Sequence, residues 1–153
     1  HYIDTHVRNL MKPGVTCTFS LWSFIPDKRH SRLGLWLYEC LRDLHLSIQA
    51  IKRPELCVRG MTFGFNTELG RLFGFRTDIR RGEDGSLALA MKPYGRLIFI
   101  TSRKARALTS NSTIDADGSL ARSFGVRLLK ALKGATGLLY KKTTYKDKDS
   151  NLL

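Results

Sequence analysis

An apolar periodicity between Leu33 and Ile51 constrains the fold of this chain more than any other feature. Apolar side chains recur there at steps of three and four residues, with polar side chains on the other side of the helical wheel. Ser31 is suited to cap such a helix, and Pro54 stops it. The sequence therefore predicts a long amphipathic helix with its apolar stripe facing the core. The stripe consists of Leu33, Leu37, Cys40, Leu41, Leu44, Ile48 and Ile51.

Alternating apolar and polar residues predict strands before and after this helix. The turn at Pro13-Gly14 leads into a half-buried strand over residues 15–21. Phe63–Phe65 predicts a short strand, and Asn66 or Thr67 is suited to cap a brief helix after it. Further alternation predicts an antiparallel meander of three strands, over residues 75–80, 87–91 and 96–102.

The C-terminal part predicts a polar loop over residues 109–119 and then a second amphipathic helix over 119–133. Gly134 and Gly137 end that helix, and residues 138–146 alternate as a closing strand. The predicted fold is an α+β domain, a small antiparallel sheet packed against two main helices. Its predicted limits are an N-terminal segment 1–14, a single domain 15–146 and a tail 147–153.

The composition is that of one domain with a real core, since the chain has 153 residues and is 42% hydrophobic. Its apolar runs fall far short of the ~20 residues that cross a bilayer, so membrane contact is expected to be peripheral. The odd number of cysteines, Cys17, Cys40 and Cys57, favours a reducing compartment. Each lies in an apolar pattern and is interpreted as a small core residue.

Catalytic and metal-binding patterns are not evident in the sequence. The four histidines are scattered, without the spacing of a zinc site. No phosphate-binding glycine loop or nucleophile elbow is present, and no nucleophile and base are paired. We therefore expect no enzymatic activity, no cofactor and no bound metal.

The charge of the chain is concentrated between Lys92 and Lys146. Twelve Lys or Arg residues against two acids give this stretch +10 of the formal net charge of +13. Such a field destabilises a compact protein by self-repulsion and favours a polyanionic partner. The predicted binding residues are Arg103, Lys104, Arg106, Arg122, Arg127, Lys130, Lys133, Lys141 and Lys142. Residues 103–106 are expected to be exposed, because they directly follow a predicted strand and precede a polar loop. Their contacts with phosphates would give affinity and salt dependence but little sequence preference.

Three segments resemble the matrix proteins of rhabdoviruses. Residues 94–100 (YGRLIFI) resemble a central strand of that family. Residues 124–139, from Phe124-Gly125 through LLKALKGATGLL, resemble a basic helix that passes through small residues into a last strand. Lys52-Arg53-Pro54 before an apolar stretch is a third similarity. The likeness spans roughly residues 15–142, but Pro13 stands alone, so the family's Pro-Pro-x-Tyr budding motif is not carried over.

The resemblance implies a structural protein of the virion, located beneath the envelope and, in the host cell, in the cytoplasm or nucleus and on membranes. Such a protein would condense the helical nucleocapsid (nucleoprotein and RNA), bind the anionic inner face of the membrane and self-associate. An alternative from the charge and size is an RNA-binding structural protein, such as a mitochondrial ribosomal protein in the mitochondrial matrix. That alternative predicts tight binding of naked structured RNA and no binding to anionic vesicles.

Overall fold

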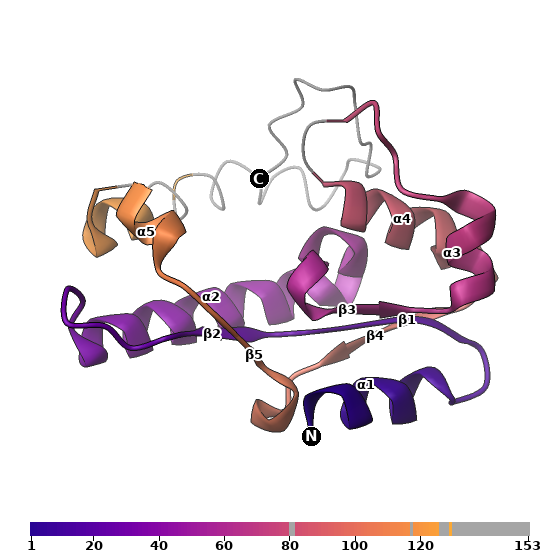
Figure 1. Cartoon of the computed structure of the whole chain (residues 1–153), viewed down its shortest axis with the longest axis horizontal. Coiled ribbons are helices and arrows are strands. Elements are labelled where there is room, and N and C mark those ends of the chain that lie inside the picture. The colour runs from indigo at the N-terminus through magenta and orange to yellow at the C-terminus, as the bar shows by residue number, and fades with distance from the viewer. Residues whose placement is uncertain (80–81, 117, 126–128, 130–153) are drawn as a thin grey trace.

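Strand β1 (Val15–Ser20) lies at the centre of the structure, a computed structural model that describes residues 1–79, 82–116, 118–125 and 129 (Figure 1). It pairs antiparallel with β3 (Phe63–Phe65) and parallel with β4 (Arg96–Ile100), in the order β3-β1-β4. The predicted α+β class is confirmed, with a small mixed sheet in place of a wholly antiparallel one.

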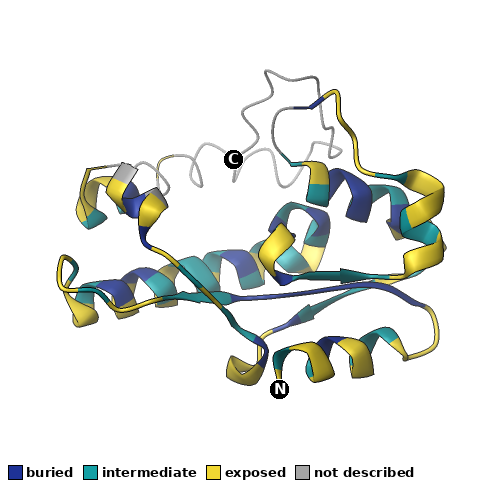
Figure 2. Ribbon diagram, in the orientation of Figure 1, coloured by how far each residue is buried: buried dark blue, intermediate teal, exposed yellow. Residues whose placement is uncertain are grey.

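Both faces of β1 are covered, so the prediction of a half-buried strand is wrong. All six of its residues are buried, as the dark blue ribbon in Figure 2 shows. Helix α1 (Tyr2–Leu10) lies below the sheet and α4 (Glu83–Met91) above it (Figure 1). The Cys17 Sγ lies 3.3 Å from the Met91 Sδ on the α4 side. Thr18 and Ser20, both fully buried, face α1 and are polar.

Helix α1 is fastened to the sheet by a buried histidine. The His6 Nδ1 lies 2.9 Å from the Thr18 hydroxyl, and its Nε2 lies 3.2 Å from the Ser20 hydroxyl. The two ring nitrogens are thus paired with buried hydroxyls, and buried polar groups without partners would be costly. No element was predicted in residues 1–14, although Ile3, Val7 and Leu10 recur at helical spacing.

The start of β1 meets the start of β4 at a close backbone approach. The Arg96 N–H donates to the Gly14 carbonyl oxygen at 2.7 Å. A Cβ at Gly95 would lie 2.7 Å from that same oxygen and 2.7 Å from the Thr16 methyl carbon. Position 95 therefore accepts only glycine, which explains the glycine before the strand in the YGRLIFI segment.

A second, smaller sheet lies beside the long helix. It pairs β2 (Trp22–Phe24) in parallel with β5 (Ala107–Thr109). Helix α2 (Arg32–Lys52) begins where predicted, since the Ser31 hydroxyl accepts a hydrogen bond from the Gly34 N–H. Pro54 ends it and starts the 3₁₀ helix η1 (Pro54–Cys57). The predicted helix is confirmed in type and in both limits.

The predicted orientation of this helix is wrong. Leu35, Tyr38 and Leu46 are its buried residues, and every residue of the predicted core stripe is exposed. The exposed fraction of the Leu and Ile side chains in the stripe ranges from 47% at Leu41 to 80% at Ile51. Periodicity showed that the helix is amphipathic but could not show which face packs, because a narrower apolar face lies on its other side. Cys40 is exposed with this stripe, whereas Cys17 and Cys57 are buried in the core as predicted.

The predicted meander is also wrong. Residues 83–91 form helix α4, and the described residues 75–79 are not in a strand. Alanine, leucine and methionine favour helix, and Glu83 and Asp84 occupy its first turn, where they complement the helix dipole. The alternation of Leu87, Leu89 and Met91 was mistaken for a strand. Helix α3 (Thr67–Phe73) is as predicted, with the Asn66 side chain capping it.

The C-terminal predictions are only partly covered by the described residues. Helix α5 (Ser112–Ala116) lies within the predicted polar loop, and residues 120–125 are helical, as predicted. The rest of the predicted second main helix, apart from Leu129, lies outside the described residues, as do the closing strand 138–146 and the tail 147–153. Within the described part of the chain, no helix has the length and apolar character needed to cross a membrane.

We predict that His6 makes stability depend on pH. Burial lowers the pKa of its imidazole, so as the pH falls through the unfolded-state pKa of about 6.5 the unfolded chain takes up this proton before the folded chain does. The free energy of unfolding should therefore decrease as the pH falls through this range. Urea unfolding at pH values of about 7.5 and 5.5 measures it, and His6→Gln should remove much of the difference.

Asn9→Ala is the control for this experiment, because the Asn9 side chain donates to the Thr5 carbonyl oxygen within α1 and does not touch the ring. It should lower stability by the same amount at both pH values. A His6→Gln protein with the full wild-type pH dependence would contradict the prediction.

Candidate polyanion-binding surface

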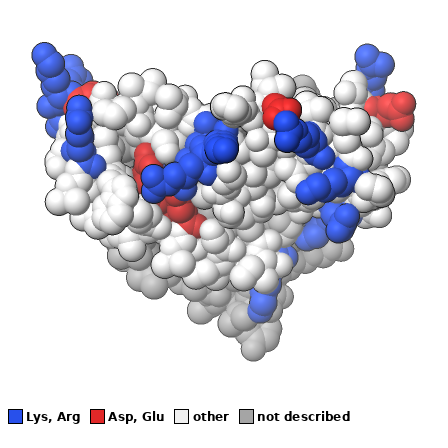
Figure 3. Space-filling view, turned by 90° about the horizontal axis from the view of Figure 1, so that it is seen from below, with Lys and Arg blue, Asp and Glu red and all other residues white. Residues whose placement is uncertain are grey.

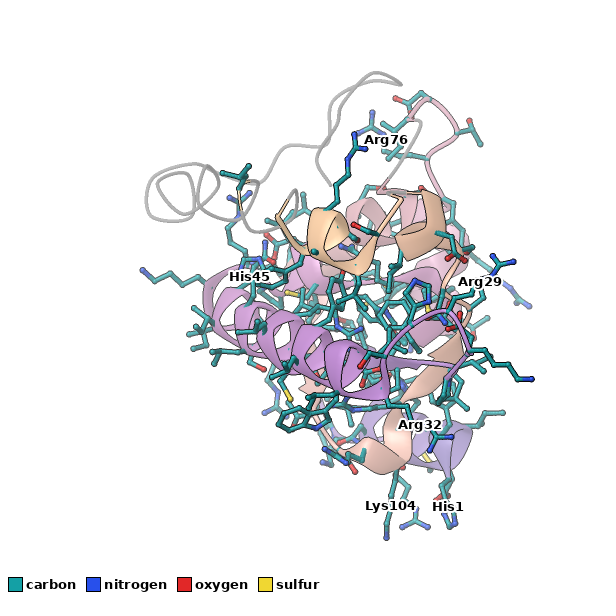
Figure 4. The ribbon with its side chains drawn as sticks, turned by 90° about the vertical axis from the view of Figure 1, so that its left-hand side faces the viewer. His1, Arg29, Arg32, His45, Arg76 and Lys104 are labelled. Atoms are coloured by element: carbon teal, nitrogen blue, oxygen red, sulfur yellow. The ribbon has the colours of Figure 1, made fainter. Side chains whose placement is uncertain are left out.

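The 3₁₀ turn η4 (Arg103–Ala105) presents two of the predicted binding residues to solvent. The Ser102 hydroxyl accepts from the Lys104 N–H at 3.3 Å and so caps the turn. Ala105 is fully buried, and its carbonyl oxygen accepts from the Ser20 hydroxyl at 2.6 Å. Because the turn is tied to β1 in this way, Arg103 and Lys104 are exposed on a fixed backbone. Lys104 projects away from the fold in Figure 4.

Arg106 was predicted to be exposed with them, and this is wrong. Its Nη2 lies 2.6 Å from the Asp43 carboxylate and its Nη1 lies 3.6 Å from Glu39, with its side chain only 16% exposed. Nη1 also donates to the Ser23 hydroxyl at 3.3 Å. Arg106 therefore joins β5 to α2 and belongs to the framework beneath the surface.

Arg42 completes this ion cluster, which we call the α2 clamp (Glu39, Arg42, Asp43 and Arg106). Its Nη2 lies 2.6 Å from the same Asp43 carboxylate, and its guanidinium lies 4.3 Å from the ring centroid of Trp22. The Glu39 carboxylate accepts from the Phe24 N–H at 2.7 Å. The clamp thus connects α2 to both strands of the smaller sheet.

The remaining predicted residues divide between free cations, structural cations and residues outside the described part. Lys92, in the same basic stretch, pairs at 2.9 Å with the buried Glu55. Arg122 is exposed. Among the described residues, no ion pair involves Arg103, Lys104 or Arg122. Outside the described residues lie Arg127, Lys130, Lys133, Lys141 and Lys142.

A second basic group, which the sequence analysis missed, precedes α2. It consists of Lys28, Arg29 and Arg32, all exposed. Arg29 projects outward in Figure 4. The sequence does not single out this group, because three cations are few beside the excess of +10 between Lys92 and Lys146.

The loop that carries this group is held by Asp27. Its carboxylate accepts from the backbone N–H groups of Arg29 (3.0 Å) and His30 (2.8 Å) and from the Asn111 side chain (2.8 Å). Burial alone would raise the pKa of Asp27, but these hydrogen bonds from Asn111 and His30 outweigh it and lower the pKa to about 2. The His30 Nε2 also lies 3.6 Å from Asp115 of α5, so the loop is joined to the start of the C-terminal region.

The cations of the described residues form separate groups rather than one continuous field. On the face shown in Figure 3, patches of Lys and Arg lie apart, with uncharged surface between them and some acids beside them. This distribution suits contact with a broad anionic surface, because each group can meet a different phosphate. It does not resemble a cleft that converges on one small anion.

Other chemistry is limited in the described part of the chain. No three His, Cys, Asp or Glu side chains there are close enough together to hold a metal ion. Burial raises the pKa of the Cys17 thiol to about 11 and that of Cys57 to about 12, which makes both poor nucleophiles. A hollow of about 390 Å³ beside β2 is lined by Trp36, Arg32 and Glu39 among others, and Glu39 is already engaged in the α2 clamp.

Comparison with known proteins gives no relative from which a function can be transferred: no protein-family model matches the chain, and no curated protein or solved structure matches it significantly. The functional argument therefore depends on the surface of this chain itself.

We predict that Asp43→Ala destabilises the fold by about 3 kcal/mol, because it leaves two largely buried guanidinium groups without their shared carboxylate. Asp4→Ala is the matched control, since Asp4 pairs with Arg8 on the surface, where the two side chains are 53% and 76% exposed. That exposed pair should contribute ~0.5 kcal/mol or less. Urea unfolding measures both variants, and equal losses would show that the α2 clamp has no structural role.

Proposed function

We propose that this chain is a viral matrix protein, a structural protein that binds the anionic inner face of the viral membrane, condenses the nucleocapsid and self-associates. The observation that carries the proposal is the turn η4. There Arg103 and Lys104 are exposed on a backbone fixed to the central strand, and neither is in an ion pair among the described residues.

The magnitudes fit a peripheral protein. Each Lys or Arg near an anionic leaflet contributes about 1 kcal/mol of binding. The five exposed cations Lys28, Arg29, Arg32, Arg103 and Lys104 would therefore suffice without an apolar anchor if they reach the leaflet together. The same cations can contact the phosphates of a nucleocapsid, and either contact weakens as salt is added.

The resemblance to rhabdovirus matrix proteins supports this proposal in part. The three-strand meander predicted within residues 15–142 is not formed, since α4 occupies the position of its second strand. Part of the helix-to-strand segment 124–139 lies outside the described residues. What remains is the YGRLIFI strand, observed as β4, together with the exposed cations.

The proposal places the protein in the virion beneath the envelope, and in the host cell on membranes and in the cytoplasm or nucleus. An RNA-binding structural protein, such as a mitochondrial ribosomal protein, would use the same cations on a different polyanion. The two functions differ in the polyanion that the protein binds: a matrix protein should bind anionic vesicles, and a ribosomal protein should bind naked structured RNA.

We predict that the protein co-sediments with vesicles of phosphatidylcholine and phosphatidylserine, and not with phosphatidylcholine alone. The double variant Arg103→Glu/Lys104→Glu should lose at least about 2 kcal/mol of this binding, a roughly 30-fold lower partition coefficient. Adding salt should weaken wild-type binding, because it screens exposed charges.

Arg71→Glu/Lys52→Glu is the charge-matched control, because both residues are exposed and lie on α3 and at the end of α2 rather than on η4. It changes the net charge equally and should bind more tightly than the η4 variant. Equal losses of vesicle binding in the two variants would show that binding depends on net charge alone and not on η4. Tight binding of naked structured RNA with no vesicle binding would replace the proposal by the RNA-binding function.

A further inference from the structure

The exposed apolar stripe of α2 is a feature of the described surface that the α2 clamp and the basic groups leave unexplained. The exposed fractions of its Leu and Ile residues are 66% at Leu33, 48% at Leu37, 47% at Leu41, 59% at Leu44, 58% at Ile48 and 80% at Ile51. Cys40 is exposed among them. Trp36, 51% exposed, lies at its edge. The stripe runs the length of the helix, about 27 Å at ~1.5 Å per residue.

The size of this stripe is unusual for a surface that stays in water. Its exposed side chains together present on the order of 600 Å², the upper end of the largest apolar patch on a typical monomer. Two such faces brought together would bury about 1,200 Å², which reaches the range of specific protein interfaces. One copy of the stripe therefore matches what half of a stable dimer requires.

The spacing of apolar residues along the stripe is nearly the same from either end of the helix. The midpoint of the stripe lies beside Arg42 and Asp43. Apolar residues lie at matching distances on the two sides of the midpoint, to within one residue: Leu33 with Ile51, Leu37 with Ile48, and Leu41 with Leu44. Two antiparallel copies of α2 related by a twofold axis would therefore place an apolar residue opposite each apolar residue. Such an isologous contact closes on itself and yields a discrete dimer.

No charge of α2 opposes this contact from within the stripe. Arg42 and Asp43 point to the other side of the helix, where they are held in the α2 clamp. Arg32 and Lys52, at the two ends, lie outside the stripe on the helical wheel.

The described C-terminal residues that touch α2 do so beside the stripe and not on it. The Leu120 methyl groups lie 3.8 and 3.9 Å from the Cβ position of Gly34, and the Phe124 ring lies 6.3 Å from that of Tyr38. Gly34 and Tyr38 are on the flank of the helix and on its buried face. This packing supports α2 and leaves the stripe open.

From these observations we infer that two copies of this chain pair through the apolar stripe of α2, antiparallel and about a twofold axis. The inference rests on the proposed function to the extent that a matrix protein must self-associate, and it names the surface and the partner for that step. The contact is separate from the basic groups, so one dimer would present two sets of cations to an anionic surface and bind it with avidity.

Sedimentation equilibrium of the full chain over a range of concentrations tests the pairing without lipid or RNA. We expect a reversible dimer, and Leu44→Glu should raise the dissociation constant at least about tenfold, because it buries a charge at the centre of the contact. Leu72→Glu is the matched control, since Leu72 is 68% exposed on α3, and it should dimerise as wild type does. Circular dichroism checks that both variants are folded.

Cysteine crosslinking tests the direction of pairing. In a Cys40→Ser background, Leu37→Cys and Ile48→Cys are made as separate proteins, leaving Cys17 and Cys57 buried. A disulfide-linked dimer should form under mild oxidation only when the two proteins are mixed, because the antiparallel register places position 37 of one copy opposite position 48 of the other. Crosslinking within either protein alone would indicate parallel pairing and overturn the twofold contact.

Each other outcome also decides the matter. A monomer at all concentrations, as when another segment of the same chain covers the stripe, would overturn the inference, and so would a dimer unaffected by Leu44→Glu. If Leu44→Glu abolished vesicle binding in a protein that is monomeric anyway, the stripe would be a lipid contact. Arg103→Glu/Lys104→Glu should lose vesicle binding and still dimerise, so failure of the pairing and failure of the proposed function are distinguishable.

Discussion

The arrangement of this molecule depends on the carboxylate of Asp43. It accepts from Arg42 on its own helix and from Arg106 on the far side of the smaller sheet, at 2.6 Å in both cases. Because all three groups are largely shielded from water, the charges must stay paired, and the pairing fixes the rotation of α2 about its axis. The face with Leu35, Tyr38 and Leu46 is turned inward and the wider apolar stripe outward. The surface available for binding is therefore decided by a polar interaction.

This explains why the sequence predicted α2 in its limits but not in its orientation. Local signals, the Ser31 cap and Pro54, act over a few residues and can be recognised without the fold. The orientation depends on Arg106, which lies more than sixty residues away along the chain. The prediction of the meander failed for a related reason. A short run of alternating Leu and Ala fits either a strand or a helix, and the packing of α4 against β1 and η1 adds to its local helix preference.

In the candidate site, too, some features follow from the local sequence and others depend on residues far away along the chain. Arg103 and Lys104 follow a strand directly, and their exposure was predicted from that position alone. Arg106, two residues further on, was predicted in the same way and is instead part of the core framework. Counting acids only between residues 92 and 146 missed Glu39, Asp43 and Glu55, which neutralise cations of that stretch from the other half of the chain. The excess of cations counted along one stretch of the sequence therefore overstates the unpaired positive charge of that stretch at the surface.

The parallel pairing of β1 with β4 has a consequence for synthesis of the protein. The central strand is translated about eighty residues before the partner that covers its second edge. At ~5–20 residues per second, Phe19 and its neighbours wait roughly 4–16 s beside the ribosome with that edge unpaired. A strand with a free edge readily pairs with another chain. The parallel topology thus leaves β1 open to wrong pairing until β4 has been made.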